Sequence, residues 1–237
     1  MRNTLAIASR ETKAYFLTPT AYVVGAMFLV LTGIFFVFEV TSTFPEATVR
    51  GLVEWAAFFM VFLSPMLTMR LLAEEQKLGT LELLLTAPVR DWEVVLGKYL
   101  AAFLTMVVTV LLTLYYVVLL YWFGDPDTGP ILSAYLGLIM YAAAALAVGL
   151  LASSMSSNQI VAAVVGTAVL LTLSFLDAVA DLLSGTAHDV LNGLSMDSHL
   201  VDFNRGVVDT SNIVYYVSVA AVLLFVTVRL IETRRWR

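Results

Sequence analysis

Long apolar runs separated by short polar segments make up most of the chain. A helix needs about 20 apolar residues to cross a bilayer core. Windows of that kind lie at residues 20–38, 54–70, 95–123, 131–152, 158–176 and 212–231. No segment of domain size is left between them. The pattern predicts an all-α integral membrane protein with six transmembrane helices, folded as a single domain over residues 1–237.

The distribution of basic residues predicts the orientation of these spans, because loops rich in Lys and Arg stay in the cytoplasm. One set of alternate segments holds eleven of the thirteen basic residues, and the other holds only Arg50 and Arg205. Most of the acidic residues lie with this second set. We therefore expect both termini in the cytoplasm and an acidic outer face.

The first residues of the chain carry a helical pattern of their own. Between residues 1 and 18, apolar and small side chains recur at spacings of three and four, and Arg10 and Lys13 lie elsewhere around the helix. Such a pattern is typical of an interfacial helix lying on the inner leaflet. Pro19 separates it from the first span. The alternative is a frayed terminus.

Composition agrees with a membrane protein and excludes several kinds of chemistry. Apolar residues make up 60% of the chain, charged residues 13%, and the mean hydropathy is +0.91. The absence of Cys excludes disulfides and thiolate sites. Glu39, Glu54, Arg70 and Asp177 fall at span ends, which disfavours transport coupled to protons or sodium. Small residues four apart, such as Gly149 and Ser153, predict close packing of spans four and five.

Motifs for catalysis or metal binding are missing from the sequence. Gly97–Lys98 lacks both the upstream glycine and the following hydroxyl residue of a phosphate-binding loop. His188 and His199, with Ser195 between them, lie in the outer segment without a metal-ligand spacing. We therefore expect no enzymatic activity, no metal and no cofactor in this chain.

The cytoplasmic connection at residues 71–93, between spans two and three, is the most informative segment. Glu74 and Glu75 open a polar helix, Gly79 breaks it, and Thr80 caps a second short helix with leucines on one face. One interpretation is an amphipathic hairpin resting on lipid headgroups. The other is a surface that a soluble partner contacts through Glu74, Glu75 and Glu82.

Four stretches of the chain resemble the ABC-2 family of permeases, the membrane subunits of ATP-driven exporters. They are RETKAYFLTPTAYVV at 10–24, PMLTMRLLAEEQKLGTLELLLTAPVRDWEVVLGKYLA at 65–101, SHLVDFNRGVVDTSNIVYY at 198–216 and VRLIETRRW at 228–236. The second stretch is the most specific. Within the family, the chain is most similar to the gliding-motility-type and nitrous-oxide-maturation-type permeases.

The resemblance implies a permease in a prokaryotic cell (inner) membrane that exports or flips an unidentified substrate. A second permease chain, identical or different, and a cytoplasmic ABC ATPase subunit would be its partners, with ATP and Mg bound by the ATPase. No nucleic acid is implied. The resemblance places the ATPase-coupling element at Glu74, Glu75, Gly79, Thr80 and Glu82. It also implies a re-entrant outer hairpin between helices five and six, within 177–211, and leaves room for an accessory extracytoplasmic subunit.

Two other functions remain open from the sequence. A non-transporting membrane anchor would recruit cytoplasmic machinery through the same loop. An intramembrane protease with a Glu-Glu pair is the other alternative, but the fourth residue after Glu75 is Gly79 rather than Arg, and neighbouring spans lack histidine.

Overall fold

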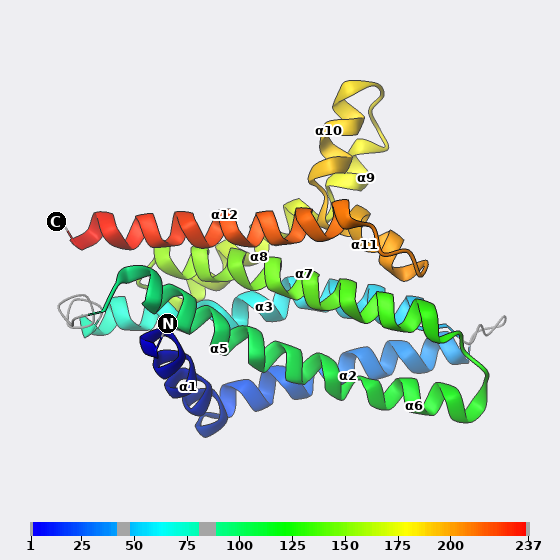
Figure 1. Ribbon diagram of the computed structural model, residues 1–237, viewed down its shortest axis with the longest axis horizontal. Coiled ribbons are helices and arrows are strands. Elements are labelled where there is room, and N and C mark those ends of the chain that lie inside the picture. The colour runs from blue at the N-terminus through cyan, green and yellow to red at the C-terminus, as the bar shows by residue number, and fades with distance from the viewer. Residues whose placement is uncertain (1, 42–47, 81–88, 236–237) are drawn as a thin grey trace.

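Helices account for all the regular structure in the described residues, which are 2–41, 48–80 and 89–235 of the computed structural model (Figure 1). In chain order the helices are α1 Arg2–Leu17, α2 Pro19–Val40, α3 Arg50–Leu78, α5 Asp91–Leu112, α6 Leu114–Phe123, α7 Thr128–Met155, α8 Gln159–Ser174, α9 Leu176–Ala180, α10 Thr186–Leu194, α11 Met196–Asn204 and α12 Thr210–Arg235. The predicted all-α class is confirmed.

Five stretches of helix within the described residues are long and apolar enough to cross a membrane. They are α2, α3, α5 continued by α6, α7 and α12. The fifth predicted window corresponds to α8, which has 16 residues and would be about 24 Å long. This is less than the roughly 30 Å of a bilayer core. The count of six spans therefore stays a prediction.

Two helices have different limits from those expected. Helix α3 continues through Pro65 and past Glu75 to Leu78, so Glu74 and Glu75 do not open a separate helix. The reason is that Leu71, Leu72 and Ala73 extend its buried face. The third predicted span is divided at Thr113, whose hydroxyl donates to the Val110 carbonyl at 2.6 Å.

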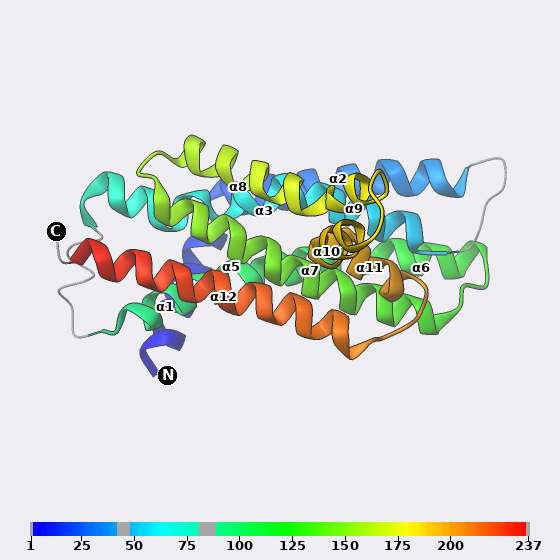
Figure 2. The same ribbon diagram turned by 90° about the horizontal axis from the view of Figure 1, so that it is seen from above.

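Helices α3 and α7 form the centre of the bundle. About two-thirds of the apolar stretch of each is buried, compared with 22% for α2 and 17% for α12. Figure 2 shows α8 and α12 on opposite sides of α7. The small residues of α7 and α8 meet as predicted where a Cβ at Gly166 of α8 would lie 3.4 Å from Cβ of Ala152 on α7, but they also pack against α3. Gly149 lies against Pro65 and Thr68 of α3 rather than against α8, and Gly166 of α8 approaches the same proline.

Helix α1 does not continue the line of α2. It crosses the first half of α5, as Figure 1 shows, and its predicted helical structure is confirmed. The close approach depends on Gly97 of α5. A Cβ atom at this position would lie 2.7 Å from Cγ2 of Ile7 and 3.1 Å from the Thr4 carbonyl oxygen. Only glycine leaves α1 enough space here.

Two short helices, α9 and α10, project sideways from the bundle in Figure 1. No residue of α10 is buried, and apolar Leu182, Leu183, Val190 and Leu194 of this arm are exposed. Helix α11 returns to the bundle, where Phe203 packs against Gly137 of α7. The outer segment predicted at 177–211 is thus a helical arm followed by a docked helix.

Replacing Gly97 with leucine is expected to separate α1 from α5 and destabilise the protein by about 1–3 kcal/mol, the usual cost of overpacking. Thermal unfolding in detergent, followed by size-exclusion chromatography of a fluorescent fusion, measures the effect. Gly193→Ala is the matched control, because a Cβ there meets no atom within 4 Å. Equal stability of the two variants would contradict the packing described.

Candidate functional site at the end of helix α3

The structure places four of the five predicted coupling residues at the end of α3. Glu74 and Glu75 lie in its last turns, and Gly79 ends it with a left-handed backbone at φ 68°. The Thr80 hydroxyl donates to the Glu75 carbonyl at 3.4 Å. Glu82 lies outside the described residues. Helix α3 therefore ends at a residue in the left-handed conformation, which glycine adopts without steric strain.

A buried lysine joins this end of α3 to two other helices. Lys98 of α5 is 2% exposed, and its Nζ lies 2.7 Å from Oε1 of Glu75 on α3 and 3.0 Å from Oε1 of Glu11 on α1. We call Glu11, Glu75 and Lys98 the Lys98 triad. A buried ammonium is costly unless it is paired and hydrogen-bonded. The two carboxylates, each about one-quarter exposed, meet that requirement.

Tyr15 of α1, and Thr18 just after this helix, contact α3 about one to two turns before Glu75. The buried Tyr15 hydroxyl donates to the Leu67 carbonyl at 2.8 Å. The Arg70 guanidinium lies over the Tyr15 ring at 5.3 Å and donates to the Thr18 hydroxyl at 3.0 Å. These contacts, like the triad, depend on the position of α1.

Helix α7 holds the opposite side of α3. The Ser153 hydroxyl donates to the Met69 carbonyl at 2.9 Å and accepts from the amides of Leu72 and Ala73 at 3.1 Å each. Gln76 donates to the Ser154 carbonyl at 2.9 Å. A side-chain hydroxyl placed among the backbone groups of a helix is a known cause of local bending. The end of α3 is therefore attached to α1, α5 and α7.

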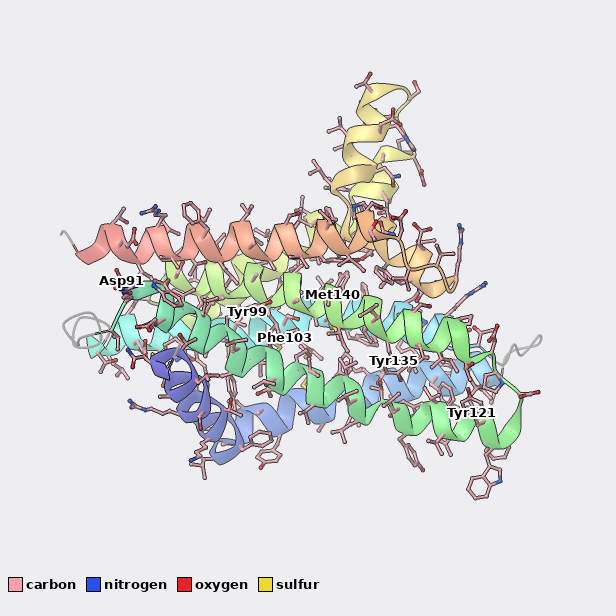
Figure 3. All side chains as sticks on the ribbon, in the orientation of Figure 1. Asp91, Tyr99, Phe103, Tyr121, Tyr135 and Met140 are labelled. Atoms are coloured by element: carbon pink, nitrogen blue, oxygen red, sulfur yellow. The ribbon has the colours of Figure 1, made fainter. Side chains whose placement is uncertain are left out.

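The start of α5 is also held by hydrogen bonds to other helices. Oε2 of Glu93 accepts from the Arg90 amide at 3.1 Å and from Nδ2 of Asn3 at 3.2 Å. Figure 3 shows Asp91 at the start of α5, with Tyr99 further along. The Tyr99 hydroxyl donates to the Ala143 carbonyl of α7 at 2.9 Å. The helices on either side of residues 81–88, α3 and α5, are thus both hydrogen-bonded to α1 and α7.

An open cavity of about 220 Å³ lies beside the triad, between α1, α3 and α5. Glu74 lines it and forms no ion pair in the part of the chain that the structure describes. Oε2 of Glu75 is buried without a hydrogen-bond donor. Of these two side chains, Glu74 is the one that the cavity offers to a cation from outside. The described residues contain no group of three or more His, Cys, Asp or Glu that could hold a metal ion.

Sequence reasoning predicts neither the ion pairs of Lys98 with Glu11 and Glu75 nor the hydrogen bonds of Ser153. In the sequence, Lys98 counts only as one of the basic residues that predict the orientation of the spans. The available signal was its place in the run Val94-Val95-Leu96-Gly97-Lys98-Tyr99, where a lysine between apolar helical positions requires a partner. The partner itself could not be found, because Glu11 is 87 residues away.

A second polar cluster lies where α7, α8 and the start of α11 meet. The Tyr141 and Ser174 hydroxyls are 2.7 Å apart, and the Ser195 hydroxyl donates to the Ser174 carbonyl at 3.2 Å. Oδ1 of Asp197 is buried nearby and accepts no hydrogen bond. Burial, and then the neighbouring carboxylate of Asp177, raise the pKa of Asp197 to about 6. A carboxyl in this environment favours its neutral form.

The fold defines a polytopic α-helical membrane protein whose most constrained polar site lies at the end of one long span. A family model described as ABC-2 family transporter protein matches residues 10–184. The match covers well over half of the 237 residues, and the chain belongs to the ABC-2 transporter family. It is a multi-pass membrane protein and a permease subunit of an ABC transporter. A search of curated proteins found no match.

Removing both carboxylates of the triad is expected to destabilise the protein. In Glu11→Gln/Glu75→Gln the buried ammonium loses its charge partners, which costs about 3 kcal/mol. Thermal unfolding in detergent measures the loss. Glu232→Gln is the control, because its pair with Arg229 lies at the surface and contributes about 1 kcal/mol or less. A double variant as stable as the wild type would show that the triad has no structural role.

Asp197 is expected to make stability depend on pH. Its pKa is higher in the folded chain than in the unfolded chain, so the folded state binds more protons between about pH 4 and pH 6. Stability is therefore lost as the pH rises through this window. Asp197→Asn should remain more stable than the wild type at pH 7 and lose the advantage near pH 4. An unchanged difference between the two proteins across this range would contradict the assignment.

Proposed function

We propose that this chain is the permease of an ABC exporter and that a separate cytoplasmic ATPase drives it through the end of α3. The observation that carries the proposal is the attachment of this end to α1 and α5 through the Lys98 triad, in a chain of the ABC-2 family. Glu74, Glu75, Gly79, Thr80 and Glu82 belong to the proposed coupling element. ATP and Mg would bind to the ATPase.

The structure supports a mechanical role for α3. Its 29 residues give a helix about 44 Å long, with one end at Arg50 and the other beside the loop. Displacement of the loop would move Glu75, and with it Lys98 and Glu11, because an ion pair buried on one side resists separation. Helices α1, α3 and α5 would then shift together against the remaining spans, as packed elements do in shear motions.

The proposal includes six spans, with both termini in the cytoplasm of a prokaryotic cell and the triad at the inner face of its membrane. The two termini lie toward the same end of the bundle in Figures 1 and 2, which an even number of spans requires. Two permease chains, identical or different, would pair around the transport path. The exposed apolar side chains of the α9–α10 arm suit partial insertion into the outer leaflet, as a re-entrant hairpin would, and its polar side could meet an accessory extracytoplasmic subunit.

The remaining alternatives differ in how well the structure supports them. A membrane anchor that binds cytoplasmic machinery would use the same surface at Glu74, so the two functions must be separated by experiment. An intramembrane protease is not supported. The only histidines, His188 and His199, lie on α10 and α11, well along the bundle from the Glu74–Glu75 pair.

Affinity purification of the tagged chain in mild detergent tests the proposal. An ATPase is expected to co-elute with the wild type, and Glu74→Ala/Glu82→Ala is expected to lose it. Lys98→Met should keep the ATPase bound but lower its hydrolysis rate several-fold, because Lys98 is buried and acts between helices. Glu232→Ala, on another helix, serves as the control.

The outcomes separate the alternatives. Absence of an ATPase under all detergent conditions would overturn the exporter. A bound ATPase whose hydrolysis is identical with wild type and Lys98→Met would favour the anchor.

A further inference from the structure

A groove of about 270 Å³ opens between α2 and α5, on the side of the molecule where α1 joins α2. Small residues of α2 form one wall and the side chains of α5 form the other. The lining residues are Phe16, Ala21, Tyr22, Gly25, Ala26, Leu29, Thr105, Val108, Thr109 and Leu112. In most pairs of membrane helices, small residues let the backbones approach closely. Here they leave an open space instead.

The walls of this groove offer no free polar group. The Thr105 hydroxyl donates to the Ala101 carbonyl at 2.8 Å, and the Thr109 hydroxyl donates to the Thr105 carbonyl at 2.9 Å. The rims, which include Tyr22, Val108 and Leu112, are exposed and mainly apolar. Whatever fills the groove must therefore be apolar and must enter from the side.

One side-chain contact lies near each end of the groove. At one end the rings of Phe16 and Tyr22 meet edge to face, with centroids 6.4 Å apart. At the other end the Tyr116 hydroxyl donates to the Leu29 carbonyl at 2.7 Å and fastens α2 to α6. From Ala21 to Leu29 a helix rises about 12 Å. One leaflet of a bilayer core is about 15 Å thick, so the groove extends through most of one leaflet and not across the membrane.

Positive charge lies on α1, the helix that contributes Phe16 to the groove. Lys13 is one helical turn before Phe16 on α1, and Arg10 is nearby. Both side chains are exposed and form no ion pair among the described residues. Cations at this level attract anionic lipid headgroups. The groove is apolar and about one leaflet long, which suits an acyl chain. The cationic side chains of α1 suit the anionic headgroup of the same phospholipid.

We propose that the groove between α2 and α5 binds an acyl chain of an anionic phospholipid, whose headgroup lies against Lys13 and Arg10. A helix from a second copy does not fit, because a helix with side chains is about 10 Å across and would overfill 270 Å³. A transport path does not fit either, because the groove extends along about 12 Å of α2 and not across a bilayer core of about 30 Å. The bound lipid would pack against the junction of α1 and α2. Helix α1 also carries Glu11 of the Lys98 triad.

Native mass spectrometry of the chain from nanodiscs of equal parts phosphatidylglycerol and phosphatidylethanolamine, with identical acyl chains, tests the proposal. The wild type should retain one phosphatidylglycerol per chain. Gly25→Leu should reduce retention about tenfold by filling the groove, since a Cβ there lies at an ordinary 3.6 Å from the Thr109 hydroxyl. Ala26→Leu is a second filling variant. Val23→Leu, on the exposed side of α2, is the control and should match the wild type.

Arg10→Ala/Lys13→Ala tests the headgroup separately. This variant should still retain one lipid but lose its preference for phosphatidylglycerol. Equal retention by wild type, Gly25→Leu and Ala26→Leu would overturn the proposal, as would a wild type without any retained lipid. A loss of dimer mass in the filling variants without loss of lipid would also overturn it and would assign the groove to a second copy. None of these results depends on whether an ATPase binds the chain.

Discussion

The ammonium group of Lys98 is buried inside a helical membrane protein, and this sets the constraint on which the rest of the site depends. Such a group is tolerated only when anionic partners replace its water. The two partners come from α1 and α3, so the fold must bring three segments together that are far apart in the chain. Gly97, the residue before Lys98, leaves α1 the space it needs, so the close approach of α1 and the burial of Lys98 occur at the same place on α5.

This constraint links the ends of the molecule. Helix α3 runs through the centre of the bundle, and near the loop it is held by Tyr15 of α1 and Ser153 of α7 in addition to Lys98. Its other end begins at Arg50, close to α11, where the Arg50 side chain donates to the Asn204 carbonyl at 3.4 Å. A force applied at the loop would therefore reach the outer segment along one continuous helix. The groove between α2 and α5 lies beside the junction of α1 and α2. A bound lipid would therefore act on α1, which the Lys98 triad joins to α3 and α5.

The class of fold could be predicted from the sequence because the length and composition of apolar runs are local properties. The residues at the end of α3 could be located for the same reason, through the turn at Gly79 and the acidic pair before it. The first and last residues of the helices could be predicted less well from the sequence. Leu71 to Ala73 extend α3 because they pack against other helices, which a local pattern does not reveal. The pairing of Lys98 with Glu11 is a contact between distant segments, and Gly149 could not be assigned to α3 rather than α8 without the packing.

In the proposed mechanism, α1 and α3 move together when the partner ATPase binds ATP. The chain has no Cys, so spin labels can be placed singly at chosen positions. In the complex with the ATPase, electron spin resonance would measure the distance from a label at Ser9 on α1 to one at Leu78 on α3, and from Leu78 to Ser157 after α7, with and without ATP. If α1 and α3 move together, the first distance stays constant while the second changes, and Lys98→Met lets the first change as well. A first distance that changes with ATP in the wild type would contradict the proposed mechanism.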